Sequence, residues 1–478
     1  MPTPADAVLA AVQALADAGQ LEAAIAAATT ALASHRLTPE AQMALLELRC
    51  DCHETRLELG AALADADAMA ALAQRHEAAH KTPHMARHKT RHKAPYLQSL
   101  AALSAASVYQ RLGRSAEATA AGQAALNAAR RSGLVLLEAR ALERLSDVGR
   151  TTGEEAAQTM LRAEQALALY KTLGDLRGQA RARLRQFALF AVAGRTADAD
   201  QAAAQALALA RQSGARHEEA RALNCLTWHV EDLALRLKRL NQALTFAQAA
   251  GDVGGQQAVI NNLANCYASL GLTHRALRLF DRAHAVATRA GARLPLLILK
   301  WNMTLLEIDL GHAERARAQA AEWEAAAGSS PRRAANASYL AGRIALMEGR
   351  PTQAAKQLAQ AVRHADASDA PGLISFLVDL SRACLAAGRT AAALRATQRA
   401  VRLHQAGDLS ARADITRSEI WWRHSQALQA CGLEAKAHEA LARAYGFVLE
   451  SIKSLSDEGL RRTTLNKHRP PARSSARG

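Results

Sequence analysis

The stretch INNLANCYASLGLTHRALRLFDRA, residues 260–283, has two helix-like halves on either side of Gly271. A glycine can adopt the positive φ that ends one helix and lets the chain reverse within a few residues. Ala276 and Ala283 follow Gly271 by five and twelve residues, so they lie two helical turns apart on one face of the second helix. The stretch therefore predicts an antiparallel helical hairpin whose second helix has a close neighbour.

The same spacing recurs along the chain. Glycines between helix-like patterns mostly fall about 40 residues apart, with a longer step after Gly60 and a double step after Gly194: Gly19, Gly60, Gly113, Gly153, Gly194, Gly271, Gly311, Gly349, Gly388 and Gly432. Alanine follows eight of them by five residues: Ala24, Ala118, Ala199, Ala276, Ala316, Ala354, Ala393 and Ala437. Twelve residues after the same glycines come Ala31, Ala125, Ala206, Ala283, Trp323, Ala361, Ala400 and Ala444. After Gly60 and Gly153 this spacing fails, at Asp65 and Gln158, which leaves the helix register open there.

Residues 260–283 resemble a tetratricopeptide repeat. The family's order of large, small, aromatic, glycine, small, aromatic and small residues is matched by Leu263, Ala264, Tyr267, Gly271, Ala276, Phe280 and Ala283. The resemblance extends in weaker form over residues 10–450, and the period near 40 is similar to the longer repeats of bacterial signalling ATPases, cyclases and maltose-regulator-type transcription factors. It implies an all-α, right-handed α-solenoid of about 10–11 antiparallel helical hairpins. Since each hairpin can bury its apolar face only against its neighbours, we expect a superhelix with a long concave surface.

The composition agrees with a helical array and suggests where it works. Half of the 478 residues are apolar but only 4% are aromatic, and alanine-rich stretches favour helices over strands. The net charge of +16 arises largely from residues 81–93 and 461–477, which favours acidic partners or weak, nonspecific binding of polyanions, although a solubilising surface is the simpler interpretation. The six cysteines are scattered, and we find neither an export signal nor an apolar run long enough to span a bilayer. We expect a cytoplasmic protein with reduced thiols and no membrane contact.

Four segments are predicted. Residues 1–75 form N-terminal hairpins, 76–95 a basic, histidine-rich linker or helix extension, and 96–450 the superhelical array. Residues 451–478 are expected to hold an exit helix and a disordered basic tail, because residues 444–471 resemble the helix that leads from such arrays into an output domain.

No pattern in the chain predicts catalysis or a cofactor. We find no phosphate-binding loop, nucleophile elbow or zinc-protease motif. Five histidines occur at intervals of four, from His76 to His92, but the basic residues between them and Pro83 disfavour a metal site. Cys50, Cys52 and His53 lack a second set of ligands that would complete a zinc site. We therefore predict neither a metal nor a catalytic residue.

The resemblance places partner contacts on the first helix of each hairpin. It maps one ligand-facing position onto Leu184, Arg221, Asn261, Trp301, Tyr339, Val378 and Trp422, followed one turn later by Asn265, Arg343 and Arg382. Leu184 and Val378 suit packing better than recognition, and each tryptophan or asparagine alone could equally fill the core or satisfy its own helix. Arginine and aromatic residues often anchor interfaces, and asparagine can hold a peptide backbone. The predicted partner-binding set is Arg221, Asn261, Asn265, Trp301, Tyr339, Arg343, Arg382 and Trp422.

Together these patterns indicate a non-catalytic scaffold or adaptor that binds a peptide or protein in its concave groove, in bacterial signalling or regulation. The alternative is the sensory half of a signalling enzyme or transcription regulator whose output domain is absent from this chain. A third interpretation is polyanion binding through the basic linker and tail.

Overall fold

The computed structural model describes residues 4–33, 37–80, 93–152, 154–230, 232–327, 331–365, 370–406, 415–459 and 461–462. These residues form 22 α-helices and no strand. The helices are α1 (Pro4–Asp17), α2 (Leu21–Leu32), α3 (Pro39–Thr55), α4 (Leu59–His80), α5 (Lys93–Arg111), α6 (Ser115–Ser132), α7 (Val135–Thr152), α8 (Ala156–Thr172), α9 (Leu176–Val192), α10 (Thr196–Gln212), α11 (Arg216–Cys225), α12 (Leu233–Ala249), α13 (Val253–Ser269), α14 (Thr273–Arg289), α15 (Arg293–Asp309), α16 (Ala313–Ala327), α17 (Pro331–Met347), α18 (Pro351–Ala365), α19 (Ala370–Ala386), α20 (Thr390–Ala406), α21 (Arg417–Ala430) and α22 (Glu434–Ser454).

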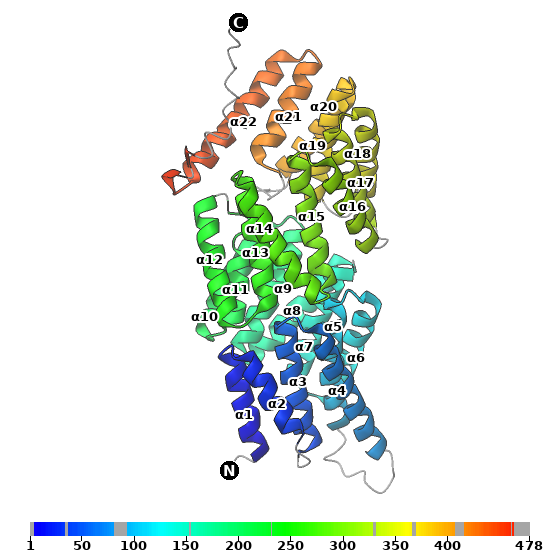
Figure 1. Ribbon diagram of the computed structural model, residues 1–478, viewed down its shortest axis with the longest axis vertical. Helices are drawn as coiled ribbons and strands as arrows, with labels where there is room; N and C mark the ends of the chain where they lie inside the picture. Colours follow the sequence, from blue (N-terminus) through cyan, green and yellow to red (C-terminus); the bar gives the residue numbers. More distant parts are fainter. Residues whose placement is uncertain are drawn as a thin grey trace.

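The helices pack as eleven sequential hairpins (Figure 1). Every helix packs against the next, and each odd-numbered helix also contacts the following odd-numbered helix. This arrangement confirms the predicted all-α, tetratricopeptide-like solenoid.

Glycine and alanine make the hairpins in the predicted way. All eight glycines that precede an alanine by five residues have a positive φ, between 72° and 77°. At Gly271 the Leu272 N–H donates to the carbonyl of Tyr267 at 2.9 Å, which satisfies one of the last carbonyls of α13 as the chain turns. Ala276 and Ala283 are fully buried, and the alanines at the equivalent positions of the other hairpins are buried or partly buried. Small side chains at these two positions let the helices of a hairpin approach closely.

The turn between α3 and α4 is not made by Gly60, which lies inside α4. Leu57 makes it, with a φ of 59°, and the Glu58 N–H donates to the His53 carbonyl at 2.8 Å. Five and twelve residues after Leu57 come Ala62 and Met69, both fully buried. The repeat is therefore intact in this hairpin once a leucine takes the place of the turn glycine.

In the fourth hairpin the register is displaced by one residue. Helix α8 begins at Ala156, and the fully buried residues that keep the seven-residue separation are Thr159 and Ala166. Gln158 is exposed. A second series of glycines with positive φ, between 60° and 71°, links several hairpins to the next: Gly133, Gly174, Gly214, Gly251 and Gly291. None of these glycines has an alanine five residues later, so the spacing that identifies the first series does not detect the second.

The first hairpin contacts the sixth, so the superhelix closes on itself after about half of its hairpins (Figure 1). A Cβ atom on Gly19 would lie 2.1 Å from the carbonyl oxygen of Ala249, and a Cβ atom on Gly251 would lie 3.0 Å from the side chain of Leu21. Arg177 and Asp17 form an ion pair at 3.6 Å across the same boundary. Glycine at positions 19 and 251 is needed because the backbones of two superhelical turns meet there.

Helix α22 ends at Ser454, and residues 455–457 are not helical. Leu455 is buried, and the Ser456 N–H donates at 3.4 Å to Asp232, the residue that caps α12. Of the basic segments, residues 81–92 and 463–478 lie outside the described residues. Within the described ranges no helix is long and apolar enough to cross a membrane.

Candidate partner-binding groove

The concave face of the superhelix is formed by the odd-numbered helices. Their close contacts with one another, such as α5 with α7, α7 with α9 and α17 with α19, place them on the inside of the curve. The even-numbered helices lie on the convex side. The first helix of each hairpin therefore supplies the inner surface, as the resemblance implied.

The predicted ligand-facing position on the first helix of each hairpin, the series that begins with Leu184, mostly faces a neighbouring helix. Leu184, Asn261, Tyr339 and Val378 all have exposed fractions of 6% or less. Each of these four is the ninth residue of its helix. In α11 the ninth residue is Asn224, whereas Arg221 is the sixth. The series therefore contributes more to packing between hairpins than to the groove surface.

Tyr339 belongs to the core, and the partly buried Trp301 packs against it. The Tyr339 ring stacks on Phe376, with 4.5 Å between ring centroids, and on Trp301, with 5.8 Å. Trp301 in turn lies 5.7 Å from Trp323 on α16. This aromatic cluster joins α15, α16, α17 and α19, and Tyr339 is too deeply buried to contact a partner directly.

The asparagines form a ladder of side-chain amides across three first helices. Asn302 donates to Asn261 at 2.9 Å, Asn261 donates to Asn262 at 3.1 Å, and Asn262 donates to Asn224 at 2.8 Å. The Asn261 amide is thus engaged within the protein. Asn265, one turn later on α13, is half-buried and forms no side-chain hydrogen bond with the described residues, so its amide is available to a ligand.

Arg343 and Arg382 meet at Asp379. Tyr339 donates its hydroxyl hydrogen to Asp379 at 2.7 Å, and Arg382 Nη1 donates to the other carboxylate oxygen at 2.7 Å. Arg343 donates to the Tyr339 hydroxyl at 3.1 Å and pairs with Asp309 at 2.7 Å. One buried carboxylate thus positions two of the predicted arginines.

Beside Arg382 lies a groove of about 650 Å³, which we call the α19–α21 groove. Its lining residues come from α17, α19, α20 and α21: Leu346, Arg382, Leu385, Ala386, Thr390, Arg423, Gln426, Gln429 and Ala430. Arg423 donates to Gln426 Oε1 at 3.0 Å, and its guanidinium carbon lies 4.1 Å from the ring centroid of Trp422, which is 43% exposed. Burial and the nearby positive charge of Arg382 lower the pKa of Arg423. The groove combines two crowded cations with glutamine amide groups and a short apolar wall.

The structure therefore brings together only part of the predicted set. Arg382 lines the groove, Trp422 flanks it and Arg343 supports it, whereas Asn261 and Asn265 lie with the asparagine ladder and Arg221 lies in the N-terminal half. The predicted set did not include Arg423, Gln426 or Gln429. Of these three, Arg423 could have been found from the sequence, because it follows Arg382 by about one repeat period.

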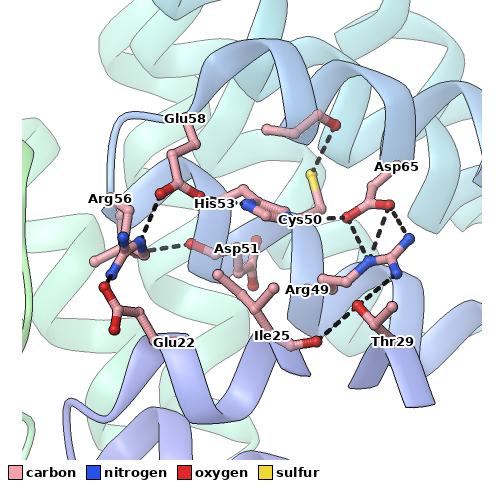
Figure 2. A network of polar contacts seen from close by, with 12 residues as sticks. Glu22, Ile25, Thr29, Arg49, Cys50, Asp51, His53, Arg56, Glu58 and Asp65 are labelled. Atoms are coloured by element: carbon pink, nitrogen blue, oxygen red, sulfur yellow. Dashed lines mark hydrogen bonds and ion pairs between the residues drawn. The ribbon is translucent and has the colours of Figure 1, made fainter. Parts of the chain in front are cut away.

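A second polar network lies between α2, α3 and α4 and accounts for Asp65 (Figure 2). Asp65 lies three residues after Ala62, which takes the alanine position, and accepts from Arg49 Nε at 3.0 Å, while His53 contacts Glu58 at 2.7 Å. Cys50, which is labelled in Figure 2, donates its thiol hydrogen to the Ala62 carbonyl at 3.4 Å. Because Arg49 also donates to the Thr29 hydroxyl of α2 at 2.9 Å, the network holds three helices together.

The cysteines and histidines that could suggest a metal site are placed as follows. Cys50 and Cys52 are buried, and His76 and His80 lie on α4, whereas His84, His88 and His92 fall outside the described residues. Among the residues that the structure covers, no three His, Cys, Asp or Glu side chains gather as metal ligands would.

Comparison with known proteins gives likeness of fold only. No protein-family model matches the chain. No curated protein sequence is significantly similar to it. Among solved structures, a Rap protein complexed with Competence and Sporulation Factor is 14% identical with a TM-score of 0.49, and the match covers 85% of this chain and 99% of that one. The apo form of the quorum sensor NprR from B. thuringiensis is 12% identical with a TM-score of 0.45, covering 72% of this chain and 99% of that one. The Cut9–Hcn1 hetero-tetramer of the APC/C is 11% identical with a TM-score of 0.36, and 97% of each chain is covered.

Proposed function

We propose that this protein is a non-catalytic scaffold or adaptor that binds an extended peptide, or an extended segment of a protein, in the α19–α21 groove. The observation that carries the proposal is the groove itself, in which Arg382 and Arg423 stand beside the amides of Gln426 and Gln429. Its role in bacterial signalling or regulation, and the alternative that the chain is the sensory half of a larger system, remain predictions from the sequence.

The lining groups suit a peptide backbone. Glutamine side chains both donate and accept, so Gln426 and Gln429 can pair with the N–H and C=O groups of an extended chain. Leu346 and Leu385 offer a small apolar surface for one side chain. Trp422 stands at the rim with almost half of its surface free, in the manner of residues that anchor interfaces.

The charge of the groove favours acidic peptides. Among the described residues Arg423 forms one ion pair, with Glu419 at 3.5 Å, and its Nε atom is buried without a hydrogen-bond acceptor. Arg382 shares Asp379 with Arg343. A carboxylate bound between Arg382 and Arg423 would therefore form charge-assisted hydrogen bonds and offset their mutual repulsion.

Selection of peptides from a random phage-displayed library on the purified protein tests the proposal. We expect selected peptides to be enriched in Asp and Glu. An Arg382→Gln, Arg423→Gln variant should bind them roughly thirtyfold more weakly, since loss of each interface anchor typically costs about 1 kcal/mol or more. The matched control is Arg278→Gln, Arg282→Gln, which removes the same charge from exposed positions on the convex α14. Equal affinity of both variants, measured by fluorescence polarisation, would contradict the proposal.

A further inference from the structure

Arginines recur at matching places on three successive first helices in the N-terminal half. The sixth residue of α7, α9 and α11 is Arg140, Arg181 and Arg221, and the tenth residue of α7 and α9 is Arg144 and Arg185. Because the helices stack side by side with the same register, these guanidinium groups come together on the concave face.

Two carboxylates on α7 occupy the same region. Glu143 and Asp147 have exposed fractions of only 7% and 8%. Arg185 lies 3.1 Å from Asp147 and 3.5 Å from Glu143, and Arg181 lies 3.1 Å from Glu143. Glu143 also accepts the Tyr170 hydroxyl hydrogen at 2.9 Å. Both acids are therefore already saturated with donors.

Two arginines are left over. Arg144 and Arg221 both act electrostatically on Asp147, as do Arg150 and Arg185. Neither Arg144 nor Arg221 forms an ion pair or a side-chain hydrogen bond with a described residue, and Arg185 Nε is buried without an acceptor. Four arginines thus act on Asp147, and two of them, Arg144 and Arg185, also act on Glu143. We call Arg144, Arg185 and Arg221 the arginine cluster.

The electrostatics of the region agree with this surplus of positive charge. Burial would raise the pKa of Glu143, but Arg181, Arg185 and Arg144 lower it to about 2. Burial and the like charge of Arg185 lower the pKa of Arg221, because its positive charge is only partly compensated. Enclosed arginines with free donors are strong sites for carboxylate and phosphate groups, since the guanidinium presents its N–H groups as a fork.

We propose that the arginine cluster is an oxyanion-binding site on the concave face, which holds a carboxylate or phosphate group of a ligand between α7, α9 and α11. The site is distinct from the α19–α21 groove and does not depend on it. The fork of Arg221 and that of Arg144 would supply the new hydrogen bonds, while Arg185 remains paired with Asp147 and adds its positive charge.

Isothermal titration calorimetry of the full-length chain at low ionic strength tests the proposal with two probes, hexaglutamate and inorganic phosphate. We expect saturable binding of at least one probe, which also tells which oxyanion the site prefers. An Arg144→Gln, Arg221→Gln variant should bind at least tenfold more weakly, while Arg278→Gln, Arg282→Gln should bind as the wild type does. Because both variants lose two positive charges, a difference between them cannot come from net charge.

Three results would overturn the inference: neither probe binds the wild type saturably, both variants lose affinity alike, or the cluster variant keeps the wild-type affinity. If Arg144→Gln, Arg221→Gln fails to fold, Arg221→Lys replaces it, because lysine keeps the charge and removes the fork. That single variant should bind the preferred probe several-fold more weakly, and unchanged affinity would count against the site.

Discussion

Tyr339 on α17 donates its hydroxyl hydrogen to Asp379 on α19 at 2.7 Å, across 40 residues of sequence. Burial and the Asp379 carboxylate raise the pKa of Tyr339 well above its usual value, so the phenol keeps the proton that it donates. The same carboxylate holds Arg382 at the wall of the α19–α21 groove. Tyr339 thus supports the groove from behind.

Removing this hydroxyl group should cost stability. Tyr339→Phe leaves the ring stack with Phe376 intact and removes a buried donor from Asp379, which we expect to cost about 1–2 kcal/mol. Tyr445→Phe is the matched control, because Tyr445 is 63% exposed on α22. Thermal unfolding followed by circular dichroism should show a lower midpoint for the first variant only. If both variants melt like the wild type, the Tyr339–Asp379 contact does not stabilise the fold.

Because two superhelical turns meet at Gly19, we expect replacing Gly19 with alanine to have a larger effect than replacing Gly349, which has a similar backbone conformation. Gly19 and Gly349 have φ values of 76° and 72°, so alanine at either costs roughly 1–2 kcal/mol for the left-handed backbone. At Gly349 an added Cβ meets open space, whereas at Gly19 it meets the Ala249 backbone. Gly19→Ala should therefore also release α1 and α2, seen as faster amide hydrogen exchange there. Similar exchange in the two variants would mean that the turns do not touch.

Asp252 links several helices and predicts a pH dependence. It caps α13 by accepting the Gly255 N–H at 2.7 Å and pairs with His217 of α11 at 2.9 Å. Burial alone would raise the pKa of Asp252, but His217, the Gly255 N–H and Arg111 lower it to about 2. Its ionised form therefore stabilises the fold above the unfolded-state pKa near 3.8, and this stabilisation is lost as the pH falls through about 2.

Asp252→Asn should accordingly be less stable than the wild type at pH 7, by about 2 kcal/mol, and the difference should shrink as the pH is lowered from about 4 towards 2. Melting temperatures across this range measure it, with Asp281→Asn on the exposed face of α14 as the control. A difference that stays constant with pH would show that the Asp252 charge has no part in stability.

The hairpins could be predicted from the sequence because their geometry depends on a few local requirements. A reversal needs a positive φ, and a close helix contact needs a small side chain, so Gly271, Ala276 and Ala283 could be placed before the structure. The prediction was wrong at Gly60 because Leu57 adopts the left-handed conformation that we had assigned to a glycine. A leucine gives no local sign of this, and only the buried Ala62 and Met69 reveal the register.

The groove was harder to predict because it depends on which helix face turns inward. Tyr339 and Asn261 have the chemistry of binding residues, yet each is enclosed by the next hairpin through the contacts with Phe376 and Asn302. Arg382 was predicted because it lies about one helical turn after Val378 on the same helix, α19. Of the arginine cluster, only Arg221 was in the predicted set. Arg144 and Arg185 were missed, although about one period separates them, because each is the tenth residue of its helix and the position that we mapped is the ninth.

Peptide binding in the α19–α21 groove is best tested by amide hydrogen exchange, measured by mass spectrometry, with and without an acidic peptide selected on the wild-type protein. We expect the peptide to slow exchange in α19 and α21, which line the groove, and to leave the convex helices α14 and α16 unchanged. The Arg382→Gln, Arg423→Gln variant should show no such protection. Protection confined to even-numbered helices remote from the groove, or equal protection in this variant, would contradict binding in the α19–α21 groove.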